Sequence, residues 1–129
     1  MPNQPVSLIV DEARRLLTLR VTGRGPSAEY TDLMLDAYRG VAEPWRYNRL
    51  IDHRQFRGFI EHQDLIRVNA YWAEVMEGRS EMPRVALLTR SALAHARVSA
   101  SGNMFSNAHF RAFSSTHDAM EWLLAEPVA

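Results

Sequence analysis

The chain has 129 residues, the size of one domain, with 47% hydrophobic and 23% charged residues, as expected of a packed globule. Fifteen basic residues balance fifteen acidic ones, so the bulk charge that attracts nucleic acid or anionic membranes is absent. The lack of cysteine excludes disulfides, thiolate nucleophiles and cysteine-bound metal. We expect one soluble domain over residues 1–129, in the cytoplasm, because no secretory leader or membrane-length apolar run is present.

The beginning of the chain predicts a β-hairpin. Val6, Leu8 and Val10 recur at every second position, and apolar and polar residues alternate more cleanly over residues 17–22, which is the period of a strand. The short polar segment 11–14 joins the two strands, and Gly23 ends the second. The alternate positions of the second strand are polar, so one of its faces should be solvated or lie near a sheet edge.

A first helix is predicted to begin at Ser27, a plausible N-cap, and to end at Glu43-Pro44. Its apolar face follows spacings of three and four residues. The residues on that face are Tyr30, Leu33, Ala37, Tyr38 and Val41.

A strand over residues 47–52 and a second helix over residues 61–77 follow, with Gly78 as the helix stop. The inward face of this helix is formed by Leu65, Val68, Trp72, Val75 and Met76. Other apolar residues lie off that face (Ile66, Ala70, Tyr71 and Ala73), and such a broad apolar arc indicates deep burial or a second contact surface.

The last part of the chain predicts two more strands, each followed by a helix. The strands cover residues 85–88 and 110–113. Ser91 caps a third helix that ends near Gly102, and Ser115 or Thr116 caps the last helix. The inward stripe of the last helix consists of Ala119, Trp122 and Leu123.

This order of elements predicts an α/β fold. A β-hairpin followed by alternating helices and strands gives a mixed sheet of four to five strands, flanked by helices. The strands separated by helices should pair in parallel, which leaves one antiparallel strand at the edge.

Several strings of the sequence resemble the SpoIIAA-like proteins, a branch of the STAS superfamily. They are the hairpin from Val6 to Val21 closed by Gly23, Leu50-Ile51-Asp52-His53-Arg54-Gln55-Phe56-Arg57-Gly58, Arg84-Val85-Ala86-Leu87-Leu88-Thr89 before Ser91, and Phe110-Arg111-Ala112-Phe113 before Ala119-Met120-Glu121-Trp122-Leu123. The resemblance implies a mixed sheet with helices, often found as a dimer. In the anti-anti-sigma members it also implies a phosphorylated serine after a central strand.

Residues 52–58 correspond to the segment that carries the serine, and they contain no serine or threonine. We therefore expect the SpoIIAA-like fold without the phosphorylation switch, since a fold by itself does not fix function.

The candidate binding residues lie in two regions. The first follows the strand over residues 47–52, where open α/β sheets place ligands, and consists of Asp52, His53, Arg54, Phe56 and Arg57. Asp52 would orient His53 or pair with Arg54, and Arg54 or Arg57 would hold a carboxylate or phosphate. Ordinary ion pairs in a strand–helix loop explain the same residues.

The second region comprises Ser91 and the segment after the third helix, where Met104 and Phe105 lie near Gly102. An apolar segment interrupted by glycine is typical of a flap over a pocket, and a loosely packed surface loop gives the same pattern.

The sequence offers little support for a catalytic or metal site. The five histidines form no pair at metal-ligand spacing, so we predict no metal and no cofactor. Ser115-Thr116-His117-Asp118 has the residue types of a hydrolase triad, but capping of the last helix explains them, because a triad must converge from separate elements.

Three functions follow in order of preference. The first is a non-catalytic protein-interaction or regulatory module, forming a homodimer and binding no nucleic acid. The second is a carrier or sensor of a small apolar or amphipathic ligand, by analogy with the CRAL-TRIO lipid carriers. The third is an enzyme that uses Asp52 and His53 as an acid–base pair.

Overall fold

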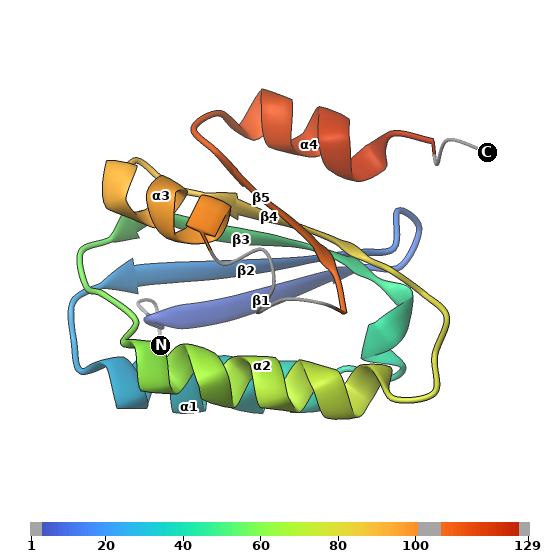
Figure 1. Cartoon of the computed structure of the whole chain (residues 1–129), viewed down its shortest axis with the longest axis horizontal. Coiled ribbons are helices and arrows are strands. Elements are labelled where there is room, and N and C mark those ends of the chain that lie inside the picture. The colour runs from blue at the N-terminus through green and yellow to red at the C-terminus, as the bar shows by residue number, and fades with distance from the viewer. Residues whose placement is uncertain (1–3, 101–106, 127–129) are drawn as a thin grey trace.

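The computed structural model describes residues 4–100 and 107–126. Its five strands form one sheet in the order β1-β2-β3-β4-β5 (Figure 1). The strands are β1 (Val6–Asp11), β2 (Leu16–Gly23), β3 (Asn48–Phe56), β4 (Arg84–Leu88) and β5 (His109–Phe113). The helices are α1 (Ser27–Arg39), the 3-10 helix η1 (Pro44–Arg46), α2 (His62–Met76), α3 (Ala92–Ala100) and α4 (Thr116–Leu124). No described helix is long and apolar enough to cross a membrane.

The predicted hairpin and mixed sheet are confirmed. β1 pairs antiparallel with β2, and the pairs β2–β3, β3–β4 and β4–β5 are parallel. Gly23 ends β2 at a φ of 80°, a conformation that glycine adopts without the steric cost of a Cβ. β1 is the antiparallel strand at the edge, as expected when the strands separated by helices pair in parallel.

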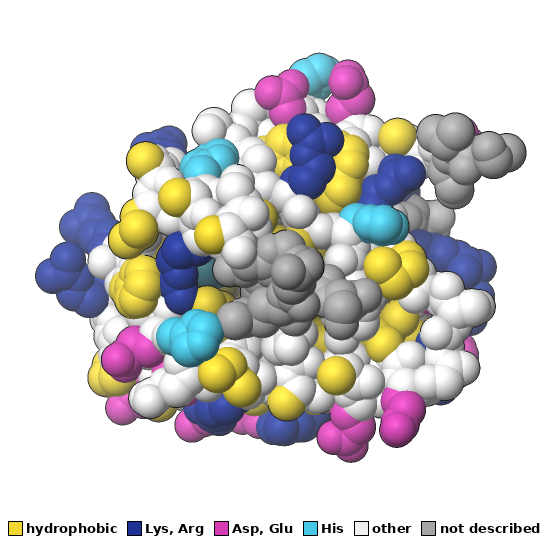
Figure 2. All heavy atoms as spheres, in the orientation of Figure 1, with side chains coloured by type: hydrophobic (Ala, Val, Ile, Leu, Met, Phe, Trp, Pro, Cys, Tyr) yellow, Lys and Arg dark blue, Asp and Glu magenta, His cyan; other side chains and the backbone are white. Residues whose placement is uncertain are grey.

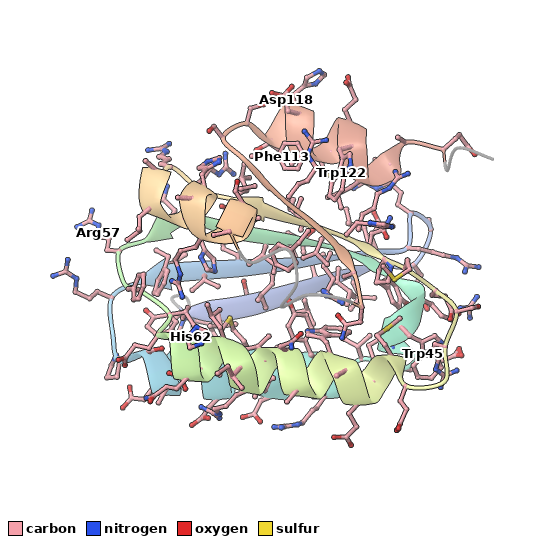
Figure 3. The ribbon with its side chains drawn as sticks, viewed as in Figure 1. Trp45, Arg57, His62, Phe113, Asp118 and Trp122 are labelled. Carbon is pink, nitrogen blue, oxygen red and sulfur yellow. The ribbon has the colours of Figure 1, made fainter. Side chains whose placement is uncertain are left out.

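Two apolar clusters hold the helices on the two faces of the sheet. The larger cluster lies beneath α1 and α2, which run side by side in Figure 1, and includes Leu19, Tyr38 and Trp72. The smaller lies beneath α4 and includes Leu88 and Leu123. At its rim the rings of Phe113 and Trp122 have centroids 5.5 Å apart (Figure 3).

α1 differs from its prediction at both ends and on its buried face. It ends at Arg39, and Pro26 rather than Ser27 is its N-cap. Leu33 is 41% exposed, whereas Met34 and Leu35 are buried. The helix packs against both the sheet and α2, so its buried arc follows these two neighbours, and the apolar spacing in the sequence does not locate it.

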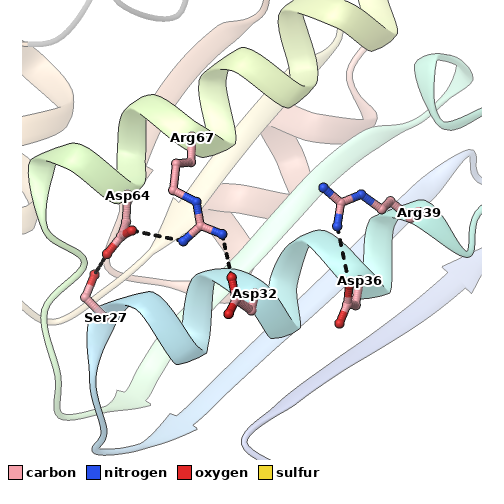
Figure 4. Close-up of polar contacts among 6 residues, drawn as sticks. All are labelled: Ser27, Asp32, Asp36, Arg39, Asp64 and Arg67. Atoms are coloured by element: carbon pink, nitrogen blue, oxygen red, sulfur yellow. Dashed lines mark hydrogen bonds and ion pairs between the residues drawn. The ribbon is translucent and has the colours of Figure 1, made fainter.

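Ser27 instead joins α1 to α2 (Figure 4). Its Oγ donates to Asp64 Oδ2 at 2.6 Å and accepts from the Glu61 backbone N–H at 2.8 Å. Arg67 of α2 donates to Asp64 and also to Asp32 of α1. The Ser27 hydrogen bond is the largest cause that lowers the pKa of the Asp64 carboxyl. These contacts fix the start of α2, and with it the segment that leaves β3.

Candidate ligand-binding cavity

A cavity of about 180 Å³ lies between the sheet, α2 and α3. Its floor comes from β2 to β5, with Leu19, Ile51, Leu87 and Phe110. Most of its walls are apolar, and come from Met34, Phe56, Phe59, Ile60, Leu65, Val68, Trp72, Leu93, Ala94, Val98 and Ala108. Hydrophobic side chains gather at the surface where α3 approaches the start of α2 (Figure 2). None of the α3 residues is fully buried, so this helix covers the cavity without entering the core.

β3 is longer than the predicted strand over residues 47–52, and this changes the meaning of the polar segment that follows. Residues 52–56 belong to the strand, so the expected strand–helix loop at this point is wrong. The reason is that β3 continues to pair with β2 as far as Gly23.

A bulge in β3 determines which of these side chains reach the cavity. Arg20 pairs with Asp52, but Thr22 pairs with Gln55, so β3 carries one extra residue between the two pairs. An extra residue reverses the alternation of faces beyond it. His53 and Phe56 therefore both line the cavity, with ring centroids 5.2 Å apart.

The buried end of the cavity contains a cation that sequence reasoning missed. Arg49 lies two residues before Ile51 on the same face of β3, and it is only 4% exposed. Its guanidinium carbon lies 3.6 Å from the centroid of the Trp72 ring. Tyr38 packs edge-on against the same ring, with centroids 4.9 Å apart. Burial lowers the pKa of Arg49 to about 10 and raises that of Tyr38 to about 12, so at neutral pH Arg49 is charged and Tyr38 is protonated.

The other end of the cavity lies where the parallel strands β3 and β4 end. Burial lowers the pKa of His53 to about 4, so its ring is neutral at pH 7. Phe59, which is 50% exposed, stacks beneath Arg97 of α3, with 4.1 Å from the guanidinium carbon to the ring centroid. Ser91 lines this end and caps α3 as predicted, accepting from the Ala94 backbone N–H at 3.2 Å.

Asp52 and Arg54 lie on the opposite face of β3 and form an ion pair. Arg54 Nε and Nη2 donate to the Asp52 carboxylate at 3.1 and 3.0 Å. This contact satisfies both groups, and Arg20 lies 3.9 Å from the same carboxylate. The structure therefore does not bring Asp52 and His53 together as an acid–base pair, because successive strand residues face opposite sides of the sheet.

Of the remaining candidates, Arg57 lies apart from the cavity lining. Arg57 is exposed and points away from it (Figure 3). Met104 and Phe105 fall outside the described residues. Among the residues that the structure describes, no group of three or more histidine or acidic side chains is placed to hold a metal ion.

A serine and a histidine do meet between α3 and the end of β5. His95 Nε2 lies 3.3 Å from Ser114 Oγ, but it also lies 3.2 Å from the Thr89 carbonyl oxygen. A carbonyl oxygen only accepts, so a hydrogen bond there requires a proton on Nε2, and a ring nitrogen that carries a proton cannot take one from Ser114. The contact ties α3 to the strands rather than activating a nucleophile.

The fold is therefore a mixed α/β sheet with a largely apolar cavity beside its central strands. Comparison with known proteins identifies its family. The SpoIIAA-like family model matches residues 16–124, and the chain belongs to this family. It is similar in structure to a protein of the DUF3478 family with a SpoIIAA-like fold from Shewanella loihica PV-4. The TM-score is 0.60 at 20% identity, over 92% of this chain and 91% of that one. No curated protein matches the sequence.

Proposed function

We propose that this chain is a non-catalytic binding module that carries or senses a small apolar or amphipathic ligand. The cavity between β3, α2 and α3 carries the proposal, because it is mostly apolar and has a few polar groups at its ends. This is the usual composition of a ligand pocket. A cavity of about 150 Å³ holds a benzene ring, so about 180 Å³ fits a ligand on the order of six to ten heavy atoms.

Membership of the SpoIIAA-like family supports a regulatory interaction module in general. The segment from β3 to α2 has no serine or threonine between Asp52 and Gly58, so phosphorylation there does not supply the signal. Occupancy of the cavity would supply it instead. A ligand that contacts both α2 and α3 changes the equilibrium between conformations if it binds one of them more tightly.

Native mass spectrometry of protein purified without denaturation tests this function. We expect a reproducible extra mass that disappears on denaturation, or saturable binding of 1-octanol by the empty protein. The control is Ala94→Phe, which places a ring in the cavity from α3 and should abolish both signals. Bare protein mass together with no saturable uptake of 1-octanol would refute the proposal.

A homodimer is a second candidate property, and α2 offers a surface for it. Ile66 is 50% exposed, and Ala70 and Ala73 are exposed on the same side of the helix. Sedimentation across micromolar concentrations measures the assembly. We expect Ile66→Glu to weaken a dimer, whereas Leu124→Glu, at another exposed apolar position on α4, should not. A monomer at all concentrations would remove this part of the proposal.

A further inference from the structure

Buried polar atoms without a hydrogen-bond partner are concentrated in the cavity. Among the described residues, they occur in Thr31, Tyr38, Arg49 and His53. The last three of these residues all line the cavity. Buried polar groups in folded proteins are nearly always paired, so Tyr38 and Arg49, which lie together at the buried end of the cavity, indicate that a partner belongs there.

The missing partner at the buried end must be a hydrogen-bond acceptor. Arg49 Nε and Nη1 are both unpartnered, and a guanidinium can only donate. The Tyr38 hydroxyl, also unpartnered, is a third donor at the same end. The Trp72 ring lies against the guanidinium at 3.6 Å, and an aromatic ring does not replace the hydrogen bonds that Nε and Nη1 lack.

The missing partner must also be negatively charged. No described aspartate or glutamate forms an ion pair with Arg49, and the only charge interactions that influence its pKa come from Tyr38 and Tyr71. A buried charge without a counterion is costly, and proteins normally pair it. By contrast, Asp52 and Arg54 on the other face of β3 satisfy each other.

From these observations we propose that the ligand is a small monocarboxylic acid, whose carboxylate binds Arg49 and Tyr38 while its hydrocarbon part fills the cavity towards His53 and Phe56. This inference rests on the proposed function and names the ligand class of the same cavity. One guanidinium balances one negative charge, which favours a carboxylate over a phosphate dianion. The distance along β3 from Arg49 to His53 is roughly 13 Å, at about 3.3 Å per residue, so the hydrocarbon part has room beyond the head group.

The far end of the cavity suits a hydrocarbon tail. His53 is neutral at pH 7, and its ring packs against Phe56. Arg97 lies at the outer end, and its guanidinium is engaged with the ring of Phe59. A ligand with its charge at Arg49 thus meets mostly apolar groups along the rest of its length.

Isothermal titration with octanoate and 1-octanol, which share a chain and differ in charge, tests the proposal. Wild-type protein should bind octanoate more tightly than 1-octanol. Arg49→Met should weaken octanoate binding by roughly 10- to 100-fold, the value of a charge-assisted hydrogen bond. It should change 1-octanol binding by less than about threefold, because the apolar contacts remain. Arg54→Met, outside the cavity, is the matched control and should bind both as the wild type does.

The outcomes separate this inference from the proposed function. If wild type and Arg49→Met bind octanoate and 1-octanol equally well, the carboxylate claim is wrong and the apolar cavity function stands. If wild-type protein binds neither 1-octanol nor any of the acids hexanoate, octanoate and decanoate, both are wrong. Hexanoate and decanoate extend the series, so that a single unsuitable chain length does not decide the result.

Discussion

Arg49 lies face-on against Trp72, with its guanidinium carbon 3.6 Å from the ring centroid, and both side chains are almost fully buried. The stacking offsets part of the cost of removing the charge from water. It leaves the buried nitrogens Nε and Nη1 without a hydrogen bond in the described structure. Arg49 therefore serves a ligand better than it serves the stability of the empty protein.

Arg49→Met tests, in the absence of ligand, whether Arg49 contributes to the stability of the empty protein. Methionine fills similar space without a charge to desolvate, so the free energy of unfolding should be unchanged within ~1 kcal/mol or higher. Urea denaturation measures it. The control Arg84→Met should lower the free energy of unfolding by ~1–3 kcal/mol, because Arg84 donates to the carbonyl oxygens of Trp122 and Ala125 at 2.7 and 2.8 Å. A loss above ~2 kcal/mol in Arg49→Met would assign Arg49 a structural role.

Filling the cavity from α3 should remove binding without harming the fold. Ala94 is half-buried and lines the cavity, so Ala94→Phe should keep the unfolding free energy within ~1 kcal/mol of the wild type and abolish octanoate binding. Ala96 is exposed on the same helix and absent from the lining, which makes Ala96→Phe the matched control. Thermal melts and titration calorimetry of the two variants measure both effects. Normal octanoate binding by Ala94→Phe would place the ligand elsewhere.

His53 should make the protein sensitive to mild acid. Its pKa is about 4 in the folded protein and 6.5 in the unfolded chain, so the unfolded state takes up the proton first as the pH falls. Stability is therefore complete above pH 6.5 and is lost progressively as the pH falls towards 4. The carboxyls of Asp52 and Asp64 have a pKa near 3.8 in the unfolded chain, and their pKa is lower in the folded protein. They therefore affect the pH dependence of stability mainly below this pH range.

Denaturation at several pH values, comparing wild type with His53→Gln, measures this effect. The variant should lose the decline between pH 6.5 and 4, whereas His117→Gln, on the exposed surface of α4, should retain it. An identical decline in wild type and His53→Gln would show that His53 is not the group responsible.

Ser27→Ala should loosen the junction between α1 and α2. It removes a hydrogen bond to Asp64 at 2.6 Å and one from the Glu61 backbone N–H at 2.8 Å. We expect a loss of ~1–2 kcal/mol in unfolding free energy, the usual effect of losing a buried polar partner. Ser99→Ala, at an exposed position of α3, should change it little. Equal stability of the two variants would show that Ser27 does not hold the start of α2.

The periodicity of the sequence was sufficient to predict the order of elements and the class of sheet. Alternation over β1 and β2 defines the hairpin, and helix spacing over α2 places Trp72 inward. The end of β3 was not predictable in the same way. His53 and Arg54 interrupt the apolar run as a loop does, and only pairing with β2 shows that the strand continues past them.

The buried cation was beyond sequence reasoning for a related reason. An arginine beside Leu50 and Ile51 ordinarily lies at a solvated strand end. Arg49 is buried because Tyr38 of α1 and Trp72 of α2 meet above it, and this depends on how two distant helices pack. The one available signal was its alternation with Ile51 and His53, all three on the cavity side of β3.

Intermolecular NOEs between octanoate and methyl-labelled protein in solution would show which residues the bound acid contacts. An acid bound in the cavity should give contacts from the octanoate chain to the methyl groups of Leu65, Val68 and Leu87, which line it. We expect no contacts to the exposed Leu33 and Ile66. Contacts confined to those two exposed residues, or no contacts at saturating octanoate, would contradict the claim that this cavity is the binding site.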